Sequence, residues 1–196
     1  MNRWLGGIGL ALVLGGCSMG VGKTQQRPAV YDLGPPAAAL VRPAELPRLS
    51  WQLQGPAWLD AEEMRYRLAY ADLERQHDYA LASWAGSPLS LLRQRLRQLL
   101  GAGGGKCVLR LELDEFVQVF ASAQLSSGDL QLRAELSDSK RRLLAEKSFR
   151  VSVPASSADA RGGAQALAKA SGELAVALLN WEKVVLQGEV LAACRD

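Results

Sequence analysis

Cys17 is the residue whose surroundings point most clearly to a chemical reaction. It follows Gly15 and Gly16, which end an uncharged apolar run from Leu5 to Leu14, and Arg3 precedes that run. A positive start, an apolar centre of about 7–15 residues and small residues before a cleavage point are typical of an export signal. The two glycines leave the extended backbone open to a peptidase, and the cysteine sulfur that follows can carry a lipid.

This arrangement looks like a bacterial lipobox, in which a lipid is attached to the cysteine, the chain is cut before it and the new amine is acylated. The apolar run is too short for a membrane-spanning helix, which needs about 20 residues. A soluble secretory signal more often ends in an Ala-x-Ala-like site. The sequence therefore predicts a lipoprotein signal peptide over residues 1–16 and lipid attachment at Cys17. Ser18 stands where lipoproteins retained at the inner membrane often carry Asp. By similarity to sorted lipoproteins, this favours the periplasmic face of the outer membrane.

The remaining reactive side chains match no catalytic or metal-binding pattern. His77 is the single histidine, so a Ser-His-Asp triad would have to use it as its base. The sequence has no cluster of His and Cys at the spacing of metal ligands. Gly103 to Gly105 lacks the Lys-Ser/Thr pair of a phosphate-binding loop, and we expect a turn there. We predict no catalytic residue, metal or cofactor, and a binding or scaffolding protein rather than an enzyme.

An acidic cluster lies on a predicted strand (Glu112, Asp114, Glu115). Glu112 and Asp114 are expected to face the same side, but no calcium-loop spacing follows them. We expect Phe116 and Phe120 to share that side, which gives a mixed apolar and acidic strip. The strip is either a partner-contact surface or a surface covered by residues 72–86.

Cys107 and Cys194 are the two other cysteines. In an oxidising periplasm they could pair and close a long loop. The alternative is two unpaired thiols, one on a strand and one in a frayed tail. The Cα atoms of a disulfide must come within about 7 Å. The sequence does not show whether these two do, so both alternatives stay open.

The overall charge argues against nucleic acid as a partner. The formal net charge is only +3, with acidic and basic residues interspersed. No second run approaches 18 apolar residues, so nothing else in the sequence is expected to span a membrane. The length after the signal peptide suits one domain.

Apolar alternation predicts the strands of that domain. Five segments alternate apolar and polar residues: 49–53, 64–70, 108–120, 130–136 and 143–153. The last three have short connections, which predicts an antiparallel meander. Residues 35–47 should run extended over the surface, and residues 72–86 could continue extended structure.

Two helices are predicted. Ser87 and Pro88 begin the first, which Gly101 ends, and its Arg93, Arg95 and Arg97 are expected on a solvated face. The second begins near Asp159 and is rich in alanine. We therefore expect an α+β fold, an antiparallel β-sheet with two main helices packed on one face. Residues 17–29 would be the lipidated cysteine and a flexible tether, 30–187 a single domain and 188–196 a C-terminal tail that frays.

Several pieces of sequence follow the lipobox in a characteristic order. They are Tyr31-Asp32-Leu33-Gly34, Met64 to Asp72, Ser83-Trp84-Ala85, Leu91 to Leu100, Val108 to Phe116 and Ser148-Phe149. Their order and spacing resemble the ABC-type transport auxiliary lipoproteins, which include the outer-membrane lipoprotein of Pqi-type lipid-transport systems. The resemblance covers nearly all of the sequence after Cys17, and Cys17 is the functional residue that carries over.

The resemblance implies a non-enzymatic accessory of a multi-protein transporter. In that family a permease and an ATPase work with an Mce-domain protein that spans the periplasm, and the lipoprotein meets it at the outer membrane. We expect a homo-oligomer that docks this partner. An alternative is a lipoprotein that acts as a chaperone for assembly of an outer-membrane complex.

Overall fold

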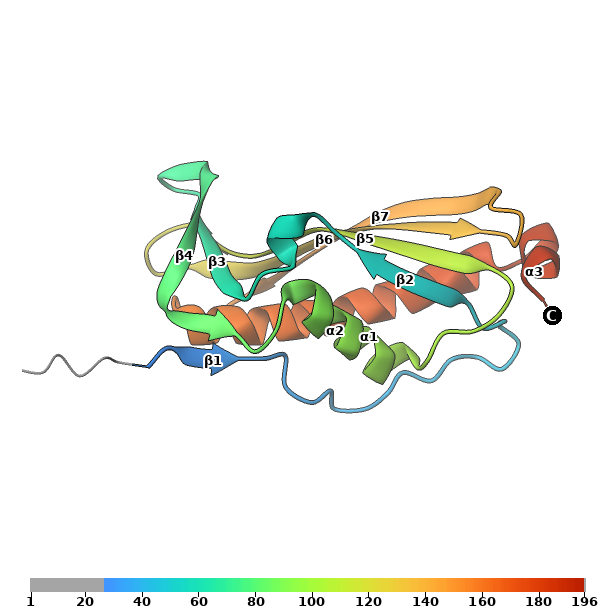
Figure 1. Cartoon of the computed structure of the whole chain (residues 1–196), viewed down its shortest axis with the longest axis horizontal. Coiled ribbons are helices and arrows are strands. Elements are labelled where there is room, and N and C mark those ends of the chain that lie inside the picture. Colours follow the sequence, from blue (N-terminus) through green and yellow to red (C-terminus); the bar gives the residue numbers. More distant parts are fainter. Residues whose placement is uncertain (1–26, 196) are drawn as a thin grey trace, which may run out of the picture.

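The computed structural model describes residues 27–195. The predicted signal peptide and Cys17 lie outside the described residues. Seven strands form one sheet: β1 (Ala29–Tyr31), β2 (Ser50–Gln54), β3 (Glu63–Leu68), β4 (Asp72–Trp84), β5 (Val108–Phe120), β6 (Ser126–Ser137) and β7 (Leu143–Pro154). Their order is β1-β4-β3-β5-β6-β7, and β2 pairs with β5 beside this path (Figure 1).

Strands β5, β6 and β7 form the predicted antiparallel meander. The ladder joins β5 to β6 from Val108 opposite Ser137 to Phe120 opposite Ser126, and β6 to β7 along nearly its whole length. On its other edge β5 pairs in parallel with β2 at its beginning and with β3 at its end. Strand β5 is therefore the central strand, with hydrogen-bonded neighbours on both sides.

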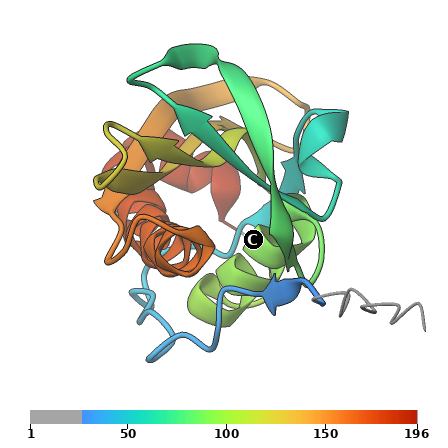
Figure 2. The ribbon, with the colours of Figure 1, turned by 90° about the vertical axis from the view of Figure 1, so that its left-hand side faces the viewer.

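Helices α1 (Pro88–Leu100) and α2 (Ala160–Val185) cover one face of the sheet, which confirms the predicted fold class (Figures 1 and 2). The predicted caps are present: the Ser87 hydroxyl accepts from the Ser90 amide, and the Asp159 carboxylate accepts from the Gly162 amide. A short 3₁₀ helix, Ala57–Leu59, precedes β3, and helix α3 (Gly188–Cys194) ends the described chain.

The core lies between the meander and α2. Strand β6 turns alternate side chains inward, and Leu130, Leu132, Ala134 and Leu136 are almost fully buried. The helix comes very close to the start of this strand. A Cβ atom on Gly128 would lie 2.7 Å from the Leu167 amide nitrogen, so only glycine fits at that point. The small residues of α2, including Ala170 and Ala175, are buried by the same close packing.

A β-bulge corrects the prediction for the acidic strip. The register of β5 against β6 shifts between Leu113 and Glu115, so Asp114 is an extra residue. The extra residue moves every later side chain to the opposite face. Phe116 and Phe120 consequently point into the core, where they are 4 % and 7 % exposed, and do not share the face of Glu112. The predicted mixed strip does not exist.

Two predictions about exposed residues are also wrong. Arg95 is only 5 % exposed, because residues 33–40 run across α1 and the Leu33 carbonyl accepts a hydrogen bond from its guanidinium. The predicted frayed tail is helix α3, and Cys194 at its end is fully buried. The sulfurs of Cys107 and Cys194 form a disulfide with a Cα–Cα distance of 5.1 Å, which decides between the two alternatives that the sequence left open.

The disulfide should contribute strongly to stability, because it joins residues 87 positions apart. By chain entropy such a loop is worth up to about 4–5 kcal/mol. We expect urea unfolding to show that the double variant Cys107→Ala/Cys194→Ala loses much of this free energy of unfolding. Hydrogen exchange should show that the amides of α3 lose protection. Reductant should destabilise the parent chain equally and leave the double variant unchanged. Full retention of α3 protection in the variant would contradict this role.

Candidate functional site

The two ends of the domain are formed by different elements of the chain. Strand β1, which begins two residues after the first described residue, pairs with β4 near Ala82, at the end of the molecule where α2 begins (Figure 1). Helix α3 and the turn between β6 and β7 lie at the opposite end. The sequence that leads back to Cys17 therefore enters the domain at one end, and the disulfide lies at the other.

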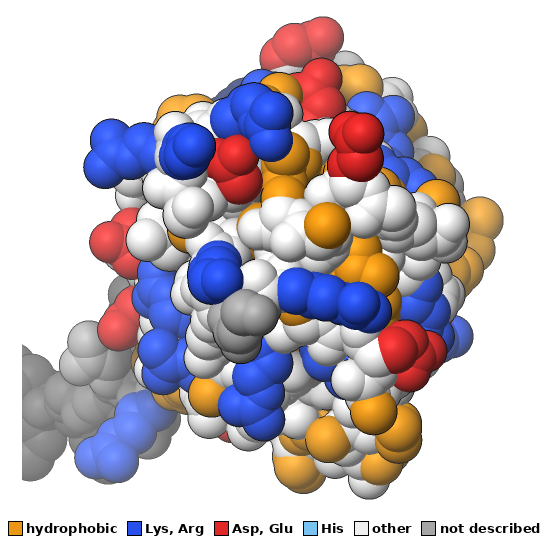
Figure 3. All heavy atoms as spheres, turned by 90° about the vertical axis from the view of Figure 1, so that its right-hand side faces the viewer, with side chains coloured by type: hydrophobic (Ala, Val, Ile, Leu, Met, Phe, Trp, Pro, Cys, Tyr) orange, Lys and Arg blue, Asp and Glu red, His pale blue; other side chains and the backbone are white. Residues whose placement is uncertain are grey.

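The end that carries the disulfide is rich in exposed cations. We call it the basic end, and it comprises Arg48, Lys106, Lys140, Arg141, Arg142 and Arg195, all of them exposed. Figure 3 shows this end, with Lys and Arg side chains spread over the face and Asp and Glu side chains fewer. Because same-sign charges at one end create a local positive potential, this surface suits an acidic partner.

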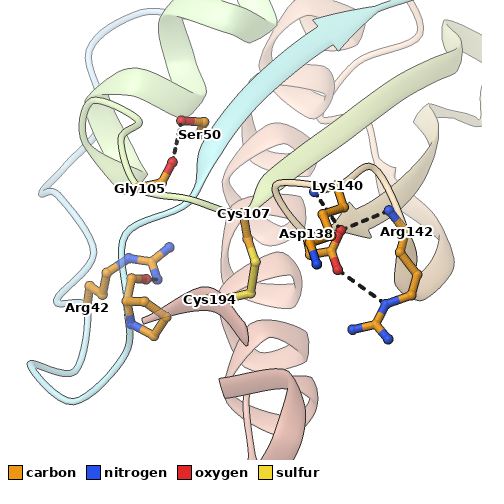
Figure 4. Close-up of a disulfide and its surroundings, with 9 residues drawn as sticks. Arg42, Ser50, Gly105, Cys107, Asp138, Lys140, Arg142 and Cys194 are labelled. Carbon is orange, nitrogen blue, oxygen red and sulfur yellow. Dashed lines mark hydrogen bonds and ion pairs between the residues drawn. A yellow bond between two sulfur atoms is a disulfide. The ribbon is translucent and has the colours of Figure 1, made fainter. Parts of the chain in front are cut away.

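Asp138 shapes one part of the basic end, the turn between β6 and β7. Its carboxylate accepts hydrogen bonds from the amides of Lys140 and Arg142, each 2.9 Å long, and from the Arg142 guanidinium (Figure 4). These bonds, with the Arg142 amide first, hold the pKa of Asp138 below its usual value. Arg141 has a φ of 63°, a left-handed conformation that is uncommon outside glycine. The turn thus displays successive cations from a conformation that Asp138 stabilises.

The disulfide fixes the other part of the basic end. Cys107 directly precedes β5 and Cys194 ends α3 (Figure 4). The disulfide therefore holds their exposed chain neighbours Lys106 and Arg195 close together. Beside it the Ser50 hydroxyl donates to the Gly105 carbonyl at 3.2 Å. The sequence did not show whether these two cysteines pair. The bond between them explains why cations from distant segments gather at this end.

A buried ion pair ties the extended segment before β2 to the helix layer. The Arg42 guanidinium binds the Glu182 carboxylate, whose side chain is 2 % exposed, and also donates to the Pro47 carbonyl. Burial raises the pKa of Glu182, and Arg42 opposes that rise. The pair borders a small cavity of about 130 Å³ that Trp51 and Leu109 help to line. No sequence pattern connected these two residues.

The acidic cluster of β5 lies beside arginine side chains of the neighbouring strands. Glu115 pairs with Arg67 at 2.8 Å, and Glu112 lies opposite Arg133 on β6. Within residues 27–195 there is no group of three or more His, Cys, Asp or Glu side chains that could hold a metal ion. Of the three carboxylates, Glu115 is therefore held by an ion pair across the sheet.

His77 lies in an aromatic cluster. Its ring stacks on Tyr66 with centroids 5.1 Å apart, and Tyr66 also contacts Tyr79 and Phe120. The Tyr79 hydroxyl donates to Gln118 at 2.9 Å, and burial raises the pKa of Tyr79 well above its usual value. These contacts give His77 a packing environment at the β1 end of the sheet.

Comparison with known proteins identifies solved structures that share the fold of this chain. No protein-family model and no curated protein matches the chain. A solved structure from Xanthomonas campestris, of the DUF330 family, aligns with 80 % of this chain and 95 % of its own at 20 % identity and a TM-score of 0.64. An uncharacterized protein aligns with 79 % of this chain and 98 % of its own at 14 % identity and a TM-score of 0.59. The chain shares its fold with these two proteins.

A lipoprotein from Neisseria meningitidis also aligns, with 76 % of this chain and 99 % of its own at 15 % identity. Its TM-score is 0.28, which is below that of a shared fold. Among the described helices none is long and apolar enough to cross a membrane.

Removal of Arg42 should destabilise the domain in a pH-dependent way. The folded-state pKa of Glu182 is raised, so this carboxyl favours the folded state at acidic pH and that contribution is lost as the pH rises through the raised pKa. Without Arg42 the buried carboxylate has lost its countercharge. We expect Arg42→Ala to lower the free energy of unfolding by about 3 kcal/mol near pH 7.5 and by clearly less near pH 4.5. The first value is at the lower end of the range for a broken buried ion pair.

Urea unfolding at the two pH values measures this difference. Arg48→Ala is the matched control, because Arg48 borders the same cavity but is exposed and has no ion pair among the described residues. An equal loss of stability for Arg42→Ala at both pH values would show that Glu182 is not the cause.

Proposed function

We propose that the chain is a lipid-anchored, non-enzymatic docking component of an ABC-type, Mce-associated lipid transport system. In this proposal it sits on the periplasmic face of the outer membrane, forms a homo-oligomer and contacts an Mce-domain protein that works with a permease and an ATPase. The observation that carries the proposal is the Gly15-Gly16-Cys17 signal, followed by the ordered pieces that resemble the auxiliary lipoproteins.

The geometry of the domain supports an anchored role. Residues 18–28 can span at most about 40 Å when fully extended. Helix α2 alone, with 26 residues, is about 39 Å long. A lipid on Cys17 would therefore hold the β1 end within about 40 Å of the membrane, and the basic end, at the other end of the domain, could extend further into the periplasm. A surface at that distance from the bilayer is suited to a partner that approaches through the periplasm.

The charge of the basic end supports a protein partner with an acidic contact surface. Its cations come from four separate parts of the chain, and the disulfide and Asp138 hold them in place. Complementary charge chiefly raises the rate of association and the specificity for the partner. Binding at this surface should therefore weaken as the salt concentration rises.

Lipid attachment is tested by metabolic labelling with radioactive palmitate in cells that export the full chain. We expect label on the parent chain and its recovery in the outer-membrane fraction. Cys17→Ser should abolish the label because the sulfur that carries the lipid is gone. Cys107→Ala/Cys194→Ala is the matched control and should keep the label. Labelling of the Cys17→Ser chain would refute the anchor.

Partner binding is tested by charge reversal at the basic end. Lys140→Glu/Arg141→Glu leaves Arg142 in its contact with Asp138, so the turn should persist. We expect recovery of the Mce-domain protein to fall about tenfold, which corresponds to about 1.4 kcal/mol. Arg75→Glu/Arg161→Glu makes the same change in net charge at exposed sites elsewhere and should bind normally. Equal loss in both variants would place the contact elsewhere.

A further inference from the structure

An apolar groove runs along the helix layer, away from the basic end's turn and disulfide. Its walls are α1, α2 and the extended segment of residues 33–40, which we call the strap. The groove has a volume of about 600 Å³, and its lining includes Pro36, Leu40, Leu99, Gly172 and Val176. This volume lies within the range of small-molecule sites, which is about 300–1,000 Å³.

The groove has open space beside the centre of α2. A Cβ atom added to Gly172 would meet nothing within 4 Å, and Val176, one turn further along the helix, is 44 % exposed. A helix face that packs against its neighbours would bury both positions. This part of α2 thus has an apolar surface with room above it.

Arg95 supplies a polar group at the wall of this groove. The residue is 5 % exposed, and one terminal nitrogen donates to the Leu33 carbonyl. Its Nε is buried and has no hydrogen-bond acceptor among the residues that the structure describes. A buried donor without an acceptor costs about 1–3 kcal/mol, and more when the group is charged. Burial lowers the pKa of Arg95, with Asp32 opposing that shift.

The charges around the groove suit an anion. Lys169 lines the groove, and its Nζ lies 3.9 Å from the Oε1 of Glu173, one turn away on α2. The charges of these two side chains therefore largely cancel. Asp32 borders the small cavity of about 30 Å³ on the other side of Arg95. The guanidinium of Arg95 is consequently the charge that faces the apolar walls with an unused donor.

The strap is free to admit a ligand. Its described backbone hydrogen bonds are at its ends, where the Gly34 amide donates to Asp32 and the Leu40 amide donates to the Leu99 carbonyl. Residues 35–39 make no hydrogen bond among the described residues. A shift of these residues would therefore break no hydrogen bond and would widen the groove beside Arg95.

We propose that the groove binds a single-chain amphiphile, with an anionic phosphate or carboxylate headgroup that accepts from Arg95. The apolar chain lies along Leu40, Leu99 and Val176, over the open position at Gly172. This site goes beyond the docking role and does not depend on it, because the ligand binds the side of the domain and the partner binds its end.

Isothermal titration with dodecyl phosphate, below its critical micelle concentration, tests the site. The protein is the whole mature chain, residues 17–196, carrying Cys17→Ser and exported so that the disulfide forms. Dodecanol and inorganic phosphate are the comparison probes. We expect dodecyl phosphate to bind at least about tenfold more tightly than either, because only it offers both the anion and the chain. Equal binding of dodecanol, or equal binding of inorganic phosphate, would overturn the proposal.

Gly172→Leu places a side chain in the groove without touching the core. We expect it to weaken dodecyl phosphate binding about tenfold. Asn180→Leu adds the same side chain to an exposed position of α2 outside the groove and should bind within about twofold of the parent. Unchanged binding by Gly172→Leu, or equal loss in both variants, would overturn the assignment to this groove.

Arg95→Met tests the headgroup contact, since it keeps most of the side-chain volume and removes the charge. We expect it to bind dodecyl phosphate and dodecanol with similar affinity, and a retained preference for dodecyl phosphate would overturn the role of Arg95. If Arg95→Met does not fold, Arg95→Lys keeps a charge but lacks the Nε donor, and it should show a reduced preference. The binding tests use no Mce-domain protein, so their failure is separate from failure of the docking role.

Discussion

The pairing of strand β5 along both of its edges is the constraint on which the rest of this domain depends. Its ladder with β6 places the meander, and its two parallel pairings place β2 and β3 on the other side. The bulge at Asp114 lets the first half present leucines to the helix layer and the second half present Phe116 and Phe120 to the same layer. Without that bulge the two halves would bury opposite faces. The disulfide at Cys107 then connects the beginning of this strand to the end of the chain.

Local patterns were enough to predict most of the elements. Alternation identified β6 and β7, and Ser87-Pro88 and Asp159 marked the beginnings of α1 and α2, because caps and period-2 burial act over a few residues. The errors all involve partners distant in sequence. The bulge depends on the register with β6, and the burial of Arg95 depends on a strap about 60 positions earlier. Similarly, the disulfide depends on a fold that brings together residues 87 positions apart.

The candidate functional surfaces were less predictable than the fold. The basic end is assembled from four segments, of which only Lys140 to Arg142 has consecutive cations, so the sequence did not show that they form one surface. The groove likewise takes its walls from the strap, α1 and α2. The sequence did contain a signal for the groove that could have been used: Gly172 interrupts an alanine-rich helix, and Val176 follows it on the same face. The proposed lipid attachment at Cys17 is the reverse case, because its sequence signal is entirely local.

Together these features suggest how the domain is oriented relative to the membrane in our proposal. The proposed anchor holds the β1 end at the membrane, the groove lies along the helix layer, and the basic end extends toward the periplasm. The most direct test of this account is crosslinking in cells, with a photoreactive amino acid in place of Arg141 in the full, anchored chain. Mass spectrometry of the crosslinked product should identify an Mce-domain protein. Recovery of an outer-membrane β-barrel alone would contradict the account and would favour a role in assembly.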